Sequence, residues 1–207
     1  MPNTDYAFSG MLKKNEKAQR KYLVTAVDIS DAAFNGGGFD PATAEWFIVG
    51  LGVEESAIEY NPDTETVTDI LGITETTVNK LETEQDLDPM TVRGGSKLAK
   101  KLYELLRDMD LSKFSMFNVM QIHAYAADSD KGPFPAEVHK NCTLTPQSLG
   151  GDSYVDMPIN INFSNDKVLG TANIWKYSDS DNGSGSTAIK FTATGSTSSG
   201  SSSSGTP

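Results

Sequence analysis

The sequence contains few of the side chains on which enzymes and metal-binding proteins usually depend. Its 207 residues include one cysteine, Cys142, and two histidines, His123 and His139. A single cysteine excludes an intrachain disulfide and a thiolate metal cluster. The sequence has no Gly-x-Ser-x-Gly motif, and no nucleophile motif accompanies either histidine. We therefore predict that the chain is not an enzyme and that it has no catalytic residues, no metal site and no cofactor.

Long apolar runs are missing, and basic residues are outnumbered. No stretch approaches the ~18 apolar residues of a membrane-spanning helix, and the first residues do not resemble a secretory leader, so we expect no membrane partner and a reducing compartment. Asp and Glu total 28 against 17 Lys and Arg, which gives a net charge of −11. Affinity for nucleic acid comes largely from Lys and Arg that neutralise phosphates. This charge argues against specific DNA binding, although not against a protein past which DNA moves.

One segment stands out by its length and its acidity. Residues 54–90 read EESAIEYNPDTETVTDILGITETTVNKLETEQDLDPM, with a single basic residue. Val, Ile and Thr are frequent in it, and β-branched side chains suit extended strands. Gly72 divides its centre, so we predict an arm over about 61–90 with strands at Thr64–Leu71 and Ile73–Leu81. Both faces of these strands are largely polar, and a strand that buries neither face lines a solvent-filled space or awaits a neighbour.

The rest of the chain predicts many short strands and one helix. Leucines and a methionine at helical spacing form one apolar stripe over Lys97 to Met109: Leu98, Leu102, Leu105, Leu106 and Met109. Ser96 precedes the helix and suits an N-cap. Strands are predicted over 22–29, 45–53, 114–127, 137–144, 155–163, 168–177 and 188–194. The fold class is therefore mainly β, a β-barrel or β-sandwich with one flanking α-helix and the extended hairpin arm.

We expect one domain with two appendages. Residues 1–21 are predicted to form a flexible N-terminal segment, because termini are poorly ordered unless a partner holds them. Residues 22–194 form the β domain, which includes the arm and the helix. Residues 195–207 are a Gly/Ser-rich tail that has too little apolar area to offset the entropy lost on ordering.

The order of these segments carries a resemblance. The acidic ribbon over 60–90 is followed at once by the Gly-Gly-Ser-capped helix and an apolar strand, then by KNCTLTP at 140–146 and YVDMPININF at 154–163. In this order and texture, over roughly residues 6–194, the chain resembles the major tail tube protein of long-tailed bacteriophages or of a related prophage tail.

The resemblance implies an assembly. Tail tube proteins form hexameric rings that stack into a hollow tube, a conduit through which DNA passes without specific binding into the host. The implied partners are further copies of the chain and other tail proteins (tape measure, terminator, baseplate or tip). The implied location is the tail of the virion, assembled in the cytoplasm of the host bacterium. Polar, acidic strands along the lumen would repel DNA over about a Debye length, ~8 Å at physiological salt.

Individual residues follow from that resemblance. Contacts between rings are expected from the arm and the N-terminal segment, at Thr64, Thr66, Val67, Ile70, Leu71, Ile73, Met11 and Leu12. The lumen wall is expected to include Glu65, Asp69, Glu75, Glu82 and Glu84.

Two other functions fit a chain of this class. A carbohydrate-binding β-sandwich would present aromatic side chains on one face and would remain monomeric or form small oligomers. A tube subunit of another injection machine would share the fold and the acidic arm.

Overall fold

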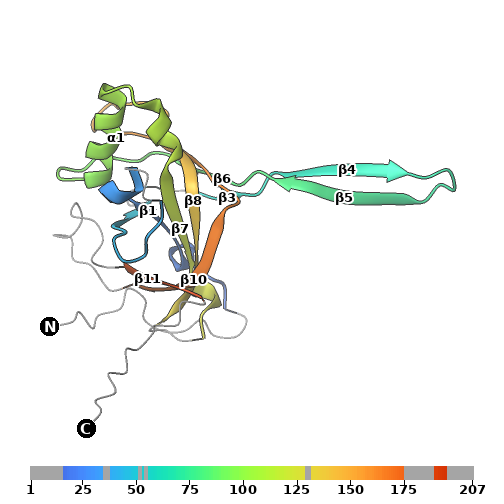
Figure 1. Ribbon diagram of the computed structural model, residues 1–207. Coiled ribbons are helices and arrows are strands. Elements are labelled where there is room, and N and C mark those ends of the chain that lie inside the picture. The colour runs from blue at the N-terminus through green and yellow to red at the C-terminus, as the bar shows by residue number, and fades with distance from the viewer. Residues whose placement is uncertain are drawn as a thin grey trace, which may run out of the picture.

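The computed structural model describes residues 16–34, 38–50, 53, 56–128, 132–174 and 189–194. Met11, Leu12 and the Gly/Ser-rich tail lie outside these ranges. The described chain is mainly β, with a sheet curled into a half-barrel and one α-helix on its flank, which confirms the predicted class (Figure 1). None of its described helices is long and apolar enough to cross a membrane.

The strands overlap the predicted segments, and two short strands, at Ile58–Glu59 and Glu84–Leu87, were not predicted. The strands are β1 (Leu23–Asp28), β2 (Trp46–Val49), β3 (Ile58–Glu59), β4 (Pro62–Thr68), β5 (Thr74–Leu81), β6 (Glu84–Leu87), β7 (Phe117–His123), β8 (Phe134–Pro146), β9 (Ile159–Asn162), β10 (Lys167–Ile174) and β11 (Ile189–Ala193). The α-helix α1 spans Lys97–Arg107, and short 3₁₀ helices cover Arg20–Tyr22, Leu111–Ser115 and Ala124–Ala126. The main sheet has the order β2-β1-β7-β8-β9-β6-β3, with β10 against β8 and β11 against β10.

Strand β8 joins the two parts of this sheet. One edge of β8 pairs with β7, while its other edge pairs with β10 over residues 134–139 and with β9 over residues 143–146. Between the two stretches lies Asn141 with φ 56°, a left-handed conformation that Asn tolerates better than most residues. The strand passes from one part of the sheet to the other at this residue, and the sheet curls around it.

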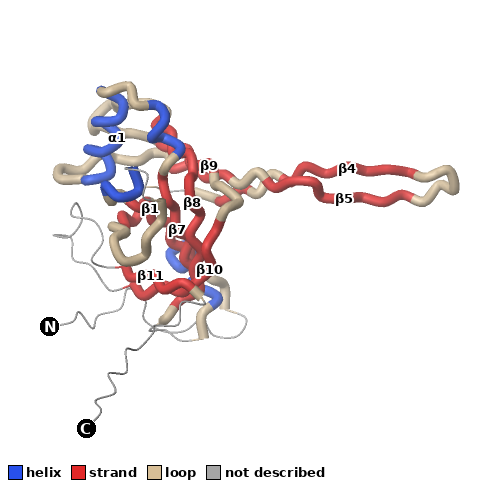
Figure 2. Tube along the Cα trace, in the orientation of Figure 1, coloured by secondary structure: helices blue, strands red, loops and turns tan. Residues whose placement is uncertain are grey.

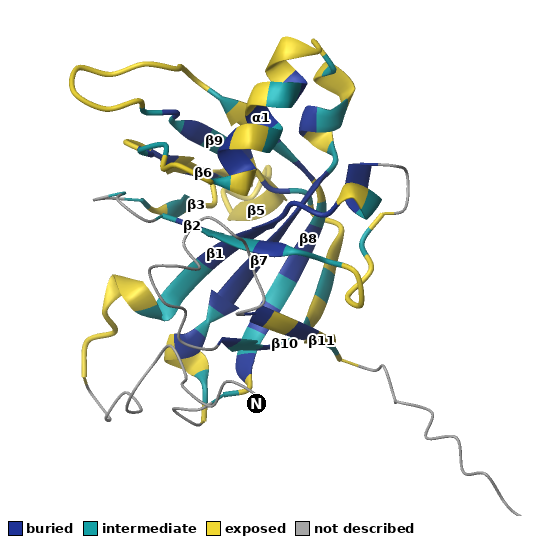
Figure 3. Ribbon diagram, turned by 90° about the vertical axis from the view of Figure 1, so that its left-hand side faces the viewer, coloured by how far each residue is buried: buried dark blue, intermediate teal, exposed yellow. Residues whose placement is uncertain are grey.

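The core has two buried clusters on the two faces of β1. Successive side chains of a strand point to opposite faces. Accordingly Ala26 belongs to a cluster with Trp46 and Phe134, whereas Val27 belongs to the cluster into which α1 packs. Figure 3 shows the strands buried on both sides in dark blue.

The helix buries a narrower stripe than its sequence predicts. Leu98, Leu102 and Leu105 are buried, as expected. Leu106 and Met109, which the sequence places on the same stripe, are 37% and 72% exposed, so that part of the prediction is wrong. The physical reason is that the helix ends at Arg107, and the chain then turns away before Met109 can reach the core.

Both ends of α1 are capped. The Ser96 hydroxyl accepts a hydrogen bond from the Ala99 amide at 3.3 Å, which confirms the predicted N-cap. At the other end, the Met109 amide donates to the Leu106 carbonyl and the Asp110 amide donates to the Leu105 carbonyl. Together these two bonds form a Schellman motif, in which the residue after the C-cap adopts a left-handed conformation.

Candidate assembly interface

The β4–β5 hairpin forms a two-stranded sheet of its own, apart from the main sheet of the described chain. It projects from the body as a two-stranded ribbon (Figures 1 and 2). Every residue of both strands is exposed. We refer to residues 61–82 as the arm. An isolated two-stranded hairpin is at best marginally stable in water, so the arm has the form of an element that a partner completes.

The arm is shorter than the predicted span of 61–90. Its strands end at Leu81, and residues 84–87 form β6 in the main sheet, paired with β9. Gln85 and Leu87 are buried there. Alternating burial of this kind marks a strand that packs one face on the core, which the polar composition of the segment conceals.

One face of the arm is a ladder of threonine hydroxyls. In the β4–β5 register, Thr66 lies opposite Thr76 and Thr68 lies opposite Thr74. The hydroxyl oxygens of each pair are 3.1 Å apart. Cross-strand pairs of this kind stabilise a hairpin by roughly 0.2–1 kcal/mol each, so the ladder stiffens a ribbon that has no core. Thr64, opposite Val78, continues the same face.

The opposite face is acidic. Glu65 and Val67 are two positions apart on β4 and therefore share this face. Glu65 lies opposite Thr77, and Val67 lies opposite Glu75. The Asn79 amide lies 3.5 Å from Glu65. This face therefore presents carboxylates on either side of one exposed valine.

The tip of the arm is apolar and ordered by its own hydrogen bonds. The Asp69 carboxylate accepts from the amides of Leu71 and Ile73 at 2.9 and 2.8 Å. Gly72 adopts φ 79°, a left-handed conformation that its missing Cβ permits. The tight turn leaves Ile70 fully exposed and Leu71 79% exposed.

The base of the arm fixes its point of exit from the body. The Glu82 amide donates to the Asn61 carbonyl at 3.3 Å, and the Asn61 side-chain amide donates to Glu84 at 2.7 Å. Lys80 forms an ion pair with Glu82. Its hydrogen bond and charge lower the pKa of the Glu82 carboxyl, while the reciprocal contact raises the pKa of Lys80.

The residues predicted for assembly thus fall into distinct places. Thr64 and Thr66 lie on the hydroxyl ladder, while Val67, Ile70, Leu71 and Ile73 are exposed at or near the tip. Of the acidic residues predicted for a lumen, Glu65 and Glu75 share one face, Asp69 holds the tip turn, Glu82 pairs with Lys80, and Glu84 lies in β6.

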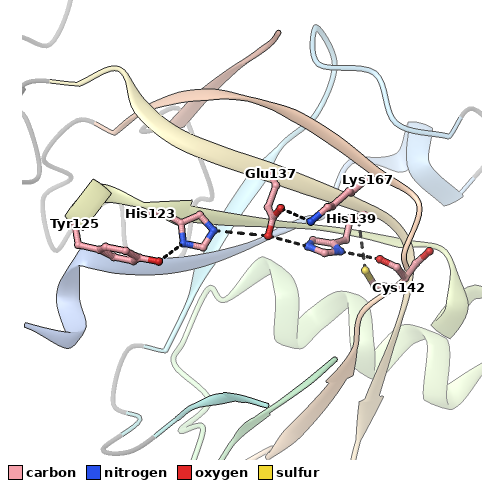
Figure 4. Close-up of polar contacts among 7 residues, drawn as sticks. His123, Tyr125, Glu137, His139, Cys142 and Lys167 are labelled. Carbon is pink, nitrogen blue, oxygen red and sulfur yellow. Dashed lines mark hydrogen bonds and ion pairs between the residues drawn. The ribbon is translucent and has the colours of Figure 1, made fainter. Parts of the chain in front are cut away.

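Sequence reasoning missed a second polar cluster on the main sheet. Glu137 of β8 lies 3.4 Å from His139 Nε2 and 3.7 Å from His123 Nε2, and it accepts a 2.8 Å bond from Lys167 (Figure 4). Glu137 and His139 are neighbours on β8, and the pairing of β7 and β10 with β8 brings His123 and Lys167 to them from other parts of the sequence. The register of the three strands is the only signal for this convergence, and a single sequence does not reveal it.

This cluster has the composition of an ion-pair network and no activated nucleophile. The nearby Cys142 thiol is buried, which raises its pKa to about 11, and its Sγ points at the His139 carbonyl at 3.4 Å. A thiol with that pKa is protonated at neutral pH and a poor nucleophile. Among the described residues, no group of three His, Cys, Asp or Glu side chains has the arrangement of a metal site.

Four of the described aromatic side chains belong to the core and not to the surface. Trp46, Phe114, Phe117 and Phe163 all lie on or beside the main strands and are buried. Burial places them in the core and keeps them from an external ligand.

Comparisons with known proteins found distantly similar solved structures and no similar sequence. No family model and no curated protein matches the sequence. Three solved structures with similar folds are the tube-terminating cap of the anti-feeding prophage, and the sheath/tube terminator and a chain of the sheath–tube complex of an extracellular contractile injection system. Their identities are 13%, 10% and 11%, with TM-scores of 0.43, 0.46 and 0.42. The matches cover 75%, 76% and 76% of this chain and 91%, 99% and 93% of the others. Similarity at this level concerns the path of the chain alone.

Proposed function

We propose that this chain is a structural subunit of a phage-tail-like tube, and that it assembles by placing its arm against a neighbouring copy. The observation that carries the proposal is the arm itself, a hairpin with both faces exposed and with aliphatic side chains at its tip. Exposed aliphatic clusters on an extended element are typical of surfaces that a partner covers. In a monomer, these aliphatic side chains would stay exposed to water without stabilising the fold.

The arm has the reach and the stiffness for this role. At ~3.3 Å per residue, the eight residues of β5 span about 26 Å. The threonine ladder and the tip turn hold the ribbon in one conformation before it meets a partner. Preorganisation of this kind lowers the entropy lost on association.

The closed form of the assembly would be a ring, six copies in the tail tube family, and stacked rings would form a tube for DNA. The strong net negative charge of −11 supports a conduit that does not hold its cargo. The acidic side chains of the arm and its base are candidates for the inner wall. Met11 and Leu12 remain candidates for contacts between rings.

The structure supplies a clean deletion with which to test the proposal. Because Asn61 and Glu82 are hydrogen-bonded to each other at the base, residues 62–81 can be replaced by Gly-Gly without breaking the main sheet. We expect a chain that keeps its cooperative unfolding and its unfolding midpoint but sediments as a monomer. A control with Thr66→Ser and Thr76→Ser keeps the hydroxyl ladder and should assemble. Assembly of the deletion variant to the same size as the full chain would contradict the proposal.

A further inference from the structure

A second exposed apolar surface lies at the C-terminal end of α1. Four large side chains there point away from the core: Tyr103, Leu106, Met109 and Leu111, with exposed fractions of 51%, 37%, 72% and 65%. Tyr103 and Leu106 are one helical turn apart and share a face of the helix, and the other two follow directly in the chain. We call these four residues the α1-end patch.

Met109 occupies the left-handed position of the Schellman motif that ends α1. It has φ 52°, where glycine is the usual residue. A side chain in the left-handed region strains the backbone, and most of the Met109 side chain is exposed. The cap explains the backbone conformation of Met109, and its exposure leaves an apolar side chain at the surface.

The arm tip has the chemistry that complements this patch. The tip presents four exposed aliphatic residues, Val67, Ile70, Leu71 and Ile73. Residues 61–84 carry six acidic side chains and one basic side chain. Residues 93–113, which include α1 and the patch, carry six basic and three acidic side chains in a chain whose net charge is −11. The two segments carry opposite net charge, but five of the six cations already pair with carboxylates of their own chain. The match therefore rests mainly on apolar surface meeting apolar surface.

We propose that the arm tip of one copy docks on the α1-end patch of a second copy. The arm leaves the body on the side away from α1, so a tip cannot reach the patch of its own chain (Figure 1). If the contact is not reciprocated by the same two copies, it is heterologous and generates rings or open helical assemblies, whereas the reciprocated form closes as a two-fold dimer. This docking rests on the proposed function and specifies its contact.

The docking also assigns the acidic face of the arm. Val67 lies on that face between Glu65 and Glu75, so a buried Val67 brings both carboxylates to the rim of the contact. Lys100 of α1 is a candidate cation for these carboxylates, because 76% of its side chain is exposed. Its ammonium lies 3.8 Å from Glu104. The rim charges steer the encounter, while the aliphatic side chains provide the affinity. Glu65 and Glu75 then belong to the interface and not to a lumen wall.

Other segments of the chain fit the patch less well. Residues 195–207 consist of Gly, Ser, Thr and Pro and offer no aliphatic side chain. Residues 11–14 offer Met11 and Leu12, but two lysines follow them directly, and their charge has the same sign as that of residues 93–113. Compared with these two segments, the arm alone combines aliphatic and acidic residues.

Cysteine cross-linking between copies tests the contact directly. A chain with Leu71→Cys is mixed with a chain carrying Leu111→Cys and oxidised mildly. We expect a disulfide-linked pair, because the docking brings these two positions together. The test is selective because the Cα atoms of a disulfide must approach to about 4.4–6.8 Å. The control partner carries Leu169→Cys, at a leucine of β10 that is 58% exposed against 65% for Leu111. Native Cys142 is buried and does not compete.

The outcomes separate the docking from the proposed function. Assembly with selective cross-linking to Leu111→Cys supports both. Assembly with equal or preferred cross-linking to Leu169→Cys, or with none at either position, overturns the docking and leaves the proposed function standing. A chain that never assembles overturns both.

Met109→Gly provides a second test that a damaged fold would not imitate. Glycine removes the left-handed strain, so the variant should unfold at a higher temperature than the native chain. It also removes the most exposed side chain of the patch, so we expect sedimentation to show weaker association, by tenfold or more in concentration. A more stable variant that assembles as well as the native chain would overturn the role of Met109.

Discussion

His139 Nε2 lies 3.4 Å from Glu137 Oε1, while the other ring nitrogen, Nδ1, lies 2.7 Å from the Ser164 carbonyl oxygen (Figure 4). A carbonyl oxygen can only accept, so Nδ1 carries the proton and Nε2 faces the carboxylate. Nε2 is buried without a hydrogen-bond partner among the described groups.

Glu137 should make stability depend on pH in the acid range. Burial raises the pKa of its carboxyl. The hydrogen bond and charge of Lys167, together with His139, lower that pKa by more than burial raises it, so the net pKa is below the ordinary value. A carboxyl with a lowered pKa in the folded state stabilises the fold above its unfolded pKa of about 4.3, and that contribution is lost as the pH falls through the folded value. We expect the free energy of unfolding to fall more steeply with acid in the native chain than in Glu137→Gln. Denaturant titrations at several pH values measure it, and equal slopes in the two proteins would contradict the network.

Cys142 should resist thiol reagents in the folded chain. Its side chain is fully buried, and burial raises its pKa to about 11. We expect slow reaction with a chromogenic disulfide reagent in buffer and rapid reaction in denaturant. Leu149→Cys, at a residue that is 57% exposed, should react at once and serves as the control for reagent quality. Rapid labelling of native Cys142 would show that the sheet around β8 opens readily.

Two leucines of α1 should differ sharply in what their truncation costs. Leu102 is fully buried, so Leu102→Ala should lower the free energy of unfolding by about 2–5 kcal/mol. Leu106→Ala, at a residue 37% exposed on the same helix, should cost far less. Thermal or urea unfolding measures both. Equal losses would mean that Leu106 packs in the core of the isolated chain.

The N-cap of α1 gives a smaller effect. Ser96→Ala removes the hydroxyl that accepts from the Ala99 amide and should cost about 1 kcal/mol. Ser96→Asp restores an acceptor and should restore most of the stability, because a carboxylate at a helix N-terminus is favourable. If Ser96→Asp were as unstable as Ser96→Ala, the cap would not contribute as described.

Local pattern was enough to predict the elements of this fold. The leucine spacing identified α1, and the Thr-rich segment divided at Gly72 identified the hairpin, because both signals repeat over many residues. Short-range chemistry also located the Ser96 cap. These features depend on neighbours in sequence, so the sequence alone carries them.

The features that were not predicted depend on partners far apart in the chain. The sequence of β6 is mostly polar and only four residues long, so its alternating burial is too short to be recognised, and the strand was predicted as part of the arm. The Glu137 cluster requires the register of β7, β8 and β10. Periodicity placed Leu106 and Met109 in the core, because the spacing of apolar residues does not show that the helix ends at Arg107.

Negative-stain electron microscopy of the purified chain over a wide concentration series tests self-assembly most directly. The account predicts ring-shaped particles or hollow tubes, whose abundance rises with concentration and which are lost when residues 62–81 are replaced by Gly-Gly. Particles the size of a 22.3 kDa monomer at every concentration would contradict it.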